Sequence, residues 1–341
     1  MISLQSRRLA PSEMSLRALG KGIEDLKKNI SQLLDYPGSK GDSGLREDVK
    51  RITPNWHGDV LITNSATQAL SSTLSFIGTG KTIAVQVPAY FAIFDQAKKL
   101  KQRIVSWETV DQLEKLRNYD AIITTSNHTP PSSVSLTASD KERIANFAKK
   151  HSAWVIEDNA YEPLWFNHEP LPIPTDPDRS IRIGSFSKIS GPGLRLGFSR
   201  ATDEILDSIR KAKIADELST SLAPQLIVSP SLTADNLDNW KETLRTRATL
   251  LGKDLEAKTR IEIPKPDGGS YLRLDLPKGC DPHTLAKACE DQDLLIDTNE
   301  HQYSDGKPRP YIRLHCGAID EKDISQAAEI LTKSINKVKR T

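Results

Sequence analysis

The chain has 341 residues, enough for one large or two modest domains with a substantial core. With 47 Lys and Arg against 45 Asp and Glu, the formal net charge of +2 favours neither nucleic acid nor a membrane surface as the partner. A small-molecule ligand is therefore expected. The 37% hydrophobic and 27% charged residues are typical of a globular chain and exclude disorder throughout.

The cysteines and the N-terminal residues bear on the cellular compartment. Cys280, Cys289 and Cys316 are odd in number and widely spaced, which suits neither a disulfide framework nor a CxxC metal site. The N-terminus has no uninterrupted apolar run of a signal peptide, and no stretch approaches the roughly 20 apolar residues that span a bilayer. We therefore expect a cytoplasmic protein without a bound metal.

In chain order, residues 1–35 carry no clear strand and are expected to form an N-terminal arm and helix. From residue 58, short apolar runs alternate with amphipathic stretches. The apolar runs lie at 59–64, 82–87, 103–108, 121–126 and 153–160. This alternation predicts an α/β fold, with a three-layer α/β/α large domain over residues 36–232 and a mostly parallel sheet covered by helices on both faces.

The pattern changes beyond residue 232 and predicts a smaller α+β C-terminal domain over residues 233–341. A long amphipathic stretch is followed by strand, helix, strand and helix patterns. They lie at 235–258, 268–277, 282–292, 311–316 and 323–338. The basic C-terminal residues 333–341 are interpreted as a solvated helix end and not as a nucleic-acid patch.

The strongest local signal is the run GSFSKISGPGLRLG, from Gly184 to Gly197. A lysine just after an apolar strand, followed by a glycine-rich loop with an arginine, is typical of an anion site that carries an amine. A basic surface loop is the alternative. Lys188 is suited to a Schiff base if burial lowers the pKa of its amine. Arg195 is suited to donate two hydrogen bonds to a phosphate that Ser185 also contacts.

Four further positions carry weaker signals, each with a structural alternative. Asp158 ends an apolar strand, where a carboxylate needs a cation unless it caps the next helix. The amides of Ala66 and Thr67 begin a helix after another strand and therefore attract anions, although capping alone explains such a turn. Tyr90 is either a ligand-stacking ring or a core residue. Arg313 is either a carboxylate-binding group or a surface strand residue.

Taken together in chain order, from Tyr36 to Arg313, the motifs resemble those of the pyridoxal-phosphate enzymes of aspartate aminotransferase type, the class I/II aminotransferases of fold type I. The resemblance is most specific in SFSK followed by PGLRLG, and it is closest to the branch with aminoadipate-type aminotransferases and the effector domains of similar regulators. It implies that Lys188 holds pyridoxal 5'-phosphate as an internal aldimine. It further implies that Asp158 pairs with the pyridine nitrogen and that Tyr161 hydrogen-bonds the ring hydroxylate.

The resemblance also implies the remaining site residues and the assembly. The cofactor phosphate would be surrounded by Ser65, Ala66, Thr67, Gln68, Ser185, Ser187 and Arg195. Tyr90 would stack on the cofactor ring, and Arg313 would hold the α-carboxylate of the substrate. Tyr36, in the YPGSKGDSGLR pattern of residues 36–46, would reach the phosphate of the neighbouring subunit, which implies a homodimer with shared active sites.

One segment departs from the family pattern. Many relatives carry Asn-Pro-Thr-Gly before the strand that ends in the aspartate, and the asparagine bonds the ring hydroxylate. If Pro131 is the matching proline, Pro130 replaces that asparagine and supplies no donor. Either Asn127 substitutes for it, also near the substrate, or Tyr161 serves the hydroxylate alone. His128 is either an acid/base group or a structural loop histidine.

Three functions are compatible with these residues. The leading one is an aminotransferase in which an amino acid becomes a keto acid, the cofactor becomes pyridoxamine phosphate, and the released Lys188 moves the proton. The second is elimination, decarboxylation or cyclisation in the same site. The third is a non-catalytic effector domain; such relatives carry a winged helix, for which the residues before Tyr36 leave no room. The amino donor and acceptor are not defined by the sequence.

Overall fold

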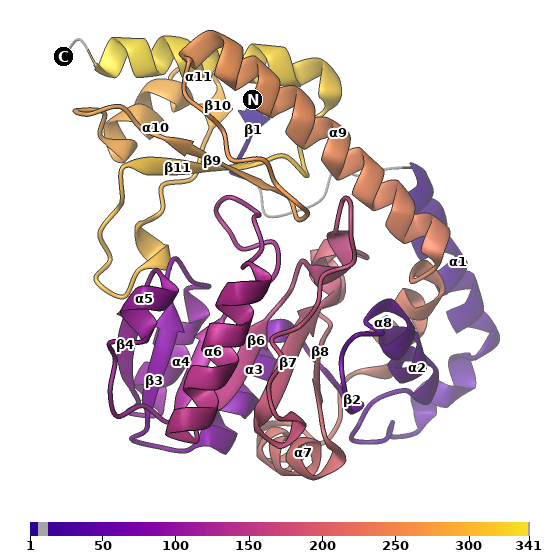
Figure 1. The fold of residues 1–341 in the computed structure, drawn as a ribbon. Coiled ribbons are helices and arrows are strands. Elements are labelled where there is room, and N and C mark those ends of the chain that lie inside the picture. Colours follow the sequence, from indigo (N-terminus) through magenta and orange to yellow (C-terminus); the bar gives the residue numbers. More distant parts are fainter. Residues whose placement is uncertain (6–12, 340–341) are drawn as a thin grey trace.

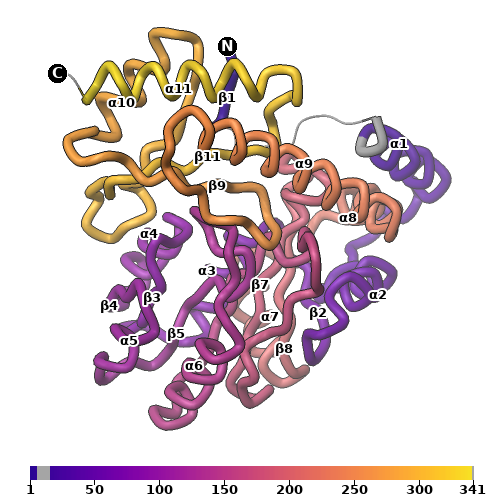
Figure 2. The backbone as a smooth tube through the Cα atoms, turned by 45° about the horizontal axis from the view of Figure 1, so that its top comes forward, coloured from indigo at the N-terminus to yellow at the C-terminus, as the bar shows by residue number. Residues whose placement is uncertain are grey.

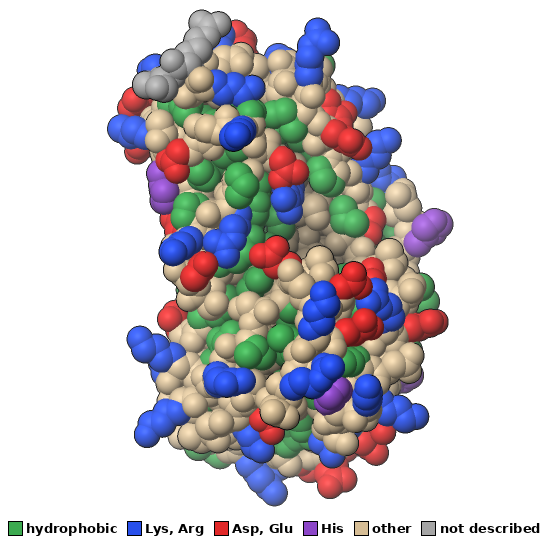
Figure 3. Space-filling view, turned by 60° about the vertical axis from the view of Figure 1, so that its left-hand side comes forward, with side chains coloured by type: hydrophobic (Ala, Val, Ile, Leu, Met, Phe, Trp, Pro, Cys, Tyr) green, Lys and Arg blue, Asp and Glu red, His purple; other side chains and the backbone are tan. Residues whose placement is uncertain are grey.

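A computed structural model describes residues 1–5 and 13–339 of the chain; the last two residues of the C-terminal basic stretch, Arg340 and Thr341, lie outside them. A large sheet and the helices that cover it form the lower half of the molecule in Figure 1, and two small sheets lie under long helices in the upper half. Acidic and basic side chains are interspersed on the face shown in Figure 3, consistent with the small net charge. None of the helices described is long and apolar enough to cross a membrane.

The large sheet has seven strands in the order β2-β8-β7-β6-β5-β3-β4. All neighbouring strands are parallel except β8, which is antiparallel to both β2 and β7. The prediction of a mostly parallel sheet is thereby confirmed. The strands are β2 (Asp59–Thr63), β3 (Thr82–Gln86), β4 (Arg103–Trp107), β5 (Ala121–Thr124), β6 (Trp154–Asp158), β7 (Ser180–Ser185) and β8 (Gly197–Ala201).

Helices cover both faces of this sheet because successive strand side chains point to opposite sides. In β3, Ile83 and Val85 pack in the cluster with α3, α4 and α7, whereas Ala84 between them packs in the cluster with α5 and α6. The helices around the sheet are α2 (Ser43–Ile52), α3 (Ala66–Ile77), α4 (Ala92–Lys99), α5 (Val110–Leu113), α6 (Ala138–His151), α7 (Asp203–Asp216) and α8 (Leu222–Val228). The three-layer arrangement is as predicted.

The C-terminal part contains the predicted α+β elements. The antiparallel pair β9 (Tyr271–Asp275) and β11 (Tyr311–His315) packs under α9 (Ala234–Thr259) and α11 (Ile324–Val338). Helix α10 (Pro282–Glu290) leads to β10 (Leu294–Leu295).

The N-terminal residues join this part of the molecule. Strand β1 (Ile2–Ser3) pairs with β10, so the expectation that residues 1–35 contain no strand is wrong. Two residues are too few to show an alternating pattern, and their pairing partner lies near the other end of the chain. The helix expected in this segment is α1 (Glu13–Lys28), which lies against α8 and α9 (Figure 1).

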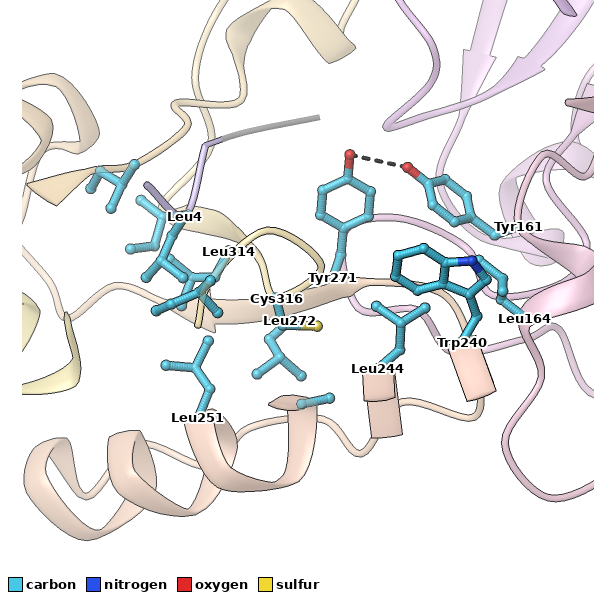
Figure 4. Packing of buried hydrophobic residues seen from close by; sticks show 14 of the residues in the cluster. Leu4, Tyr161, Leu164, Trp240, Leu244, Leu251, Tyr271, Leu272, Leu314 and Cys316 are labelled. Carbon is cyan, nitrogen blue, oxygen red and sulfur yellow. Dashed lines mark hydrogen bonds between the residues drawn. The ribbon is translucent and has the colours of Figure 1, made fainter. Parts of the chain in front are cut away.

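The hydrophobic core is continuous between the two parts. Tyr161 and Leu164 of the large part belong to the same buried cluster as Leu244, Leu251 and Leu272 of the C-terminal part (Figure 4). Helix α9 runs along both parts (Figure 2). The boundary expected near residues 232 and 233 thus falls where α9 begins and does not interrupt the core; the domain limits remain predictions.

Two neighbouring leucines of α9 test this packing. Leu251 is fully buried, whereas 42% of Leu250 is exposed. We expect Leu251→Ala to lower the free energy of unfolding by about 2–5 kcal/mol because it leaves a cavity in the core. The control Leu250→Ala should change it by less than about 0.5 kcal/mol. Urea unfolding measures both values, and equal losses would contradict the assignment of the buried face of α9.

Candidate active site

A cavity of about 300 Å³ lies between the carboxyl ends of the parallel strands and the C-terminal part. It brings together eleven of the residues predicted from sequence. They are Ser65, Ala66, Thr67, Tyr90, Asp158, Tyr161, Ser185, Ser187, Lys188, Arg195 and Arg313. Residues that are far apart in the sequence therefore line the same cavity.

One end of the cavity is built by a close approach of three segments. Gly197, the first residue of β8, pairs with Thr63 at the end of β2 and with Ser185 at the end of β7. A Cβ atom at Gly197 would lie 2.2 Å from the backbone nitrogen of Ala66, the first residue of α3. The absence of a side chain thus lets the positive end of α3 lie beside the turn that carries Lys188, which favours an anion there.

Polar side chains surround this end. The Ser65 hydroxyl caps α3 by accepting a hydrogen bond from Gln68 N at 3.2 Å, so the capping alternative is also correct for this turn. The Ser185 hydroxyl caps the short 3-10 helix η4 (Phe186–Lys188) by accepting from Ser187 N at 3.2 Å. Arg195 is the third polar residue at this end of the cavity. Its side chain is exposed, and its backbone is in the left-handed region, with φ of 51°.

An aromatic ring closes the side of the cavity. The Tyr90 hydroxyl lies 3.0 Å from the Thr67 hydroxyl, and Tyr90 is 41% exposed, so it is not a core residue. Its position beside the start of α3 leaves the ring available to a ligand.

The Asp158 carboxyl lies at the end of β6, partly buried on the floor of the cavity. Loss of hydration raises the pKa of Asp158 to about 6. A carboxylate in such a place is stabilised by a bound cation, which is what the ring nitrogen of pyridoxal phosphate presents when protonated.

A further wall of the cavity is formed by Tyr161 and Lys188 of the large part and by Tyr271 and Arg313 of the C-terminal part. The Lys188 Nζ lies 5.4 Å from the centre of the Tyr161 ring. The Tyr161 hydroxyl donates a hydrogen bond of 3.1 Å to the Tyr271 hydroxyl (Figure 4). The Arg313 guanidinium lies 4.6 Å above the Tyr271 ring and is buried, so the surface-strand alternative for Arg313 is wrong.

The structure places three predicted site residues outside the cavity lining. The Gln68 Oε1 accepts a hydrogen bond from Asn64 N, within its own turn. Tyr36 is 84% exposed on the surface. The buried Asn127 amide donates to Glu162 and accepts from Lys141, so it is held beneath the cavity and not at its surface.

The segment that departs from the family pattern contributes Thr125 and Pro130 to the cavity instead. His128 is buried and its Nδ1 lies 2.7 Å from the Asp267 carboxylate, while its ring packs on Gly268. This contact joins the large part to the C-terminal part, which supports the structural interpretation of His128.

Sequence reasoning missed several residues of the cavity. Pro88, Ala89, Phe91, Ala160, Pro192, Tyr271, His301 and Gln302 also line it. Proximity to Tyr90 was a usable signal for Phe91, whereas His301 and Gln302, on the short helix η7 (Glu300–Gln302), reach the cavity only through the tertiary fold.

Comparisons with known proteins agree with this site. The family model for aminotransferase class I and II matches residues 15–331. Aromatic-amino-acid aminotransferase 1 of Thermococcus litoralis is 24% identical over 98% of this chain and 88% of its own length. The uncharacterized HTH-type transcriptional regulator YdcR of Escherichia coli is 26% identical over 82% of this chain and 65% of its own.

Solved structures show the same fold. Kynurenine aminotransferase of Pyrococcus horikoshii, in complex with PMP, superposes with a TM-score of 0.89 at 21% identity, covering 99% of this chain and 91% of that one. The chain belongs to the aminotransferase class I and II family, which is pyridoxal-phosphate-dependent. The Lys188 amine, the partly buried Asp158 carboxyl and the helix start that favours an anion fit that cofactor.

The partly buried Asp158 carboxyl gives a pH-dependent prediction for the cofactor-free protein. Folding raises the pKa of Asp158 from 3.8 to about 6, because the folded protein disfavours the charged carboxylate. The free energy of unfolding therefore falls as the pH rises from about 4 to about 6 and the carboxyl loses its proton. We expect cofactor-free Asp158→Asn to be more stable than wild type by about 3 kcal/mol at pH 8 and equally stable near pH 4. Urea unfolding at both pH values tests this; a difference independent of pH would contradict it.

Proposed function

We propose that the protein transfers an amino group between an amino acid and a keto acid, with the Lys188 amine as the group that holds the pyridoxal-phosphate aldehyde. The observation that carries the proposal is the convergence of Lys188, Asp158 and the start of α3 on one cavity. When bound, the cofactor supplies an aldehyde that condenses with amines and a ring that withdraws electrons.

Each residue of the site has a separate role in the proposed reaction. The Lys188 amine lies inside the cavity and would, with the cofactor bound, move the proton from the substrate Cα to the cofactor carbon that had carried the aldehyde. The Asp158 carboxylate keeps the ring nitrogen protonated. The Arg313 guanidinium binds the substrate carboxylate from the far wall. Asn127 is engaged with Glu162 and Lys141, which supports Tyr161 as the donor that serves the ring hydroxylate alone.

The aminotransferase interpretation is favoured over elimination, decarboxylation or cyclisation because relatives with named enzyme activities include an aromatic-amino-acid aminotransferase and a 2-aminoadipate transaminase. The three free, buried cysteines support a reducing compartment, the cytoplasm.

The proposal includes a homodimer in which Tyr36 reaches the partner's phosphate site. Its support is the number of exposed apolar side chains on α1 and the segment that follows it, here called the apolar face. They are Leu16, Ile23, Ile30, Leu33, Leu34 and Tyr36. Leu34 is 90% exposed, and a cluster of exposed apolar side chains of this kind marks an interaction surface.

Replacing the cofactor-binding amine tests the proposed function. We expect Lys188→Ala to lose the visible absorbance of the bound aldehyde, to resist fixation of the cofactor by borohydride, and to lose at least about a thousandfold in turnover. Lys287→Ala, at an exposed lysine, serves as the control. A yellow Lys188→Ala protein that borohydride still labels would rule out the assignment.

A charge placed on the apolar face tests the dimer. Leu34→Glu should weaken dimerisation at least about tenfold in analytical ultracentrifugation, because a carboxylate would be buried in the interface. The matched control Leu171→Glu changes a leucine that is 64% exposed elsewhere and should leave dimerisation unaltered. Dimerisation of the Leu34→Glu protein with wild-type affinity would place the interface on another face.

A further inference from the structure

Arg313, the residue proposed to hold the substrate carboxylate, already has an anionic partner within the chain. Its Nη2 donates a hydrogen bond to the Asp297 carboxylate, and the two side chains are only 10% and 6% exposed. The backbones of Asp297 and Arg313 also pair in a β-bridge, which fixes the acid beside the guanidinium.

The pair is arranged with Arg313 toward the cavity and Asp297 behind it. Arg313 lines the cavity, whereas Asp297 is outside the lining. The Tyr271 ring lies under the guanidinium, and Arg313 Nε has no hydrogen-bond partner among the described residues. A ligand carboxylate that reaches Arg313 from the cavity would thus share one cation with Asp297.

The Asp297 carboxylate changes the charge that a ligand meets at Arg313. An unpaired buried guanidinium would disfavour every ligand without an anion, because the charge would stay desolvated and uncompensated. Asp297 makes the wall neutral before any ligand binds. A ligand carboxylate then gains attraction from Arg313 but meets repulsion from Asp297, whereas a neutral group in its place meets neither.

We propose that Asp297 is a specificity-determining residue that weakens the preference for an α-carboxylate and lets the site take primary amines that lack one. This inference rests on the proposed aminotransferase function and adds a substrate class to it. The rings of Tyr90, Phe91 and Tyr271 at the cavity surface suit an aromatic group on that amine.

The first experiment measures binding without turnover. Asp297→Asn keeps an oxygen acceptor for Arg313 and removes the charge; Asp305→Asn, at an exposed ion pair with Arg309, removes a charge from the same segment as the control. Titration calorimetry on each holoenzyme uses 3-phenylpropanoate and its neutral amide. We expect Asp297→Asn to bind the carboxylate at least about tenfold more tightly, with the affinity for the amide unchanged.

The second experiment compares L-phenylalanine with phenethylamine, which differ by the carboxylate alone. For wild-type holoenzyme, the concentrations of the two compounds that give a half-maximal change in absorbance should lie within about tenfold of each other. Asp297→Asn should change the ratio of these concentrations at least about tenfold in favour of L-phenylalanine. Asp297→Ser, which leaves room for water beside Arg313, must shift the ratio in the same direction even if Asp297→Asn folds poorly.

Two kinds of failure are distinguishable. Unchanged or weaker carboxylate binding in Asp297→Asn, or no response of wild-type holoenzyme to phenethylamine while L-phenylalanine responds, would overturn the role of Asp297. An absorbance that responds neither to these two compounds nor to a mixture of amino acids in any variant would instead overturn the proposed function as well.

Discussion

The site depends on the close approach of β8 to the first turn of α3 at Gly197. Because β8 runs antiparallel between β2 and β7, its first residue lies beside the ends of both strands. Any side chain there would displace the backbone of Ala66, 2.2 Å from the Cβ position. The helix start that favours an anion and the turn that carries Lys188 are thus held together by the backbone, with no need for a flexible side chain.

The two parts of the molecule are tied on both sides of the cavity. Tyr161 and Tyr271 share a hydrogen bond within it, and His128 pairs with Asp267 behind it. The backbone nitrogen of Ala89 also donates to the Gln302 carbonyl at 2.9 Å. These contacts and the shared core fix the distance between the amine and the carboxylate-binding wall, which a reaction at a positioned substrate requires.

Much of the fold follows from local patterns in the sequence. The apolar strands alternate with amphipathic helices, and Asp158 and Lys188 were found because each follows such a strand. Strand β1 and the position of β8 are not predicted from sequence, since a two-residue pairing and an antiparallel strand inserted next to the sheet edge depend on segments far away in the chain. Local patterns state which residues end a strand but not which strands become neighbours.

The same limit applies to the site. Asn127 seemed available to the ligand, yet its amide is occupied by Glu162 and Lys141 from other segments. Asp297 carries no local signal at all, because its importance comes from a bridge to Arg313 on another strand. Partners of buried polar groups are set by tertiary contacts, so the residues that tune the chemistry are harder to find than those that perform it.

The central claim is that the Lys188 cavity transfers amino groups, and one spectrum tests it most directly. The visible absorbance of purified holoenzyme is recorded after addition of a mixture of amino acids without keto acid, and again after addition of a keto acid. The account predicts that the band of the lysine-bound cofactor is replaced by that of the aminated cofactor and that the keto acid restores it. A band that persists, or one that returns unaided while a new product accumulates, would contradict amino-group transfer.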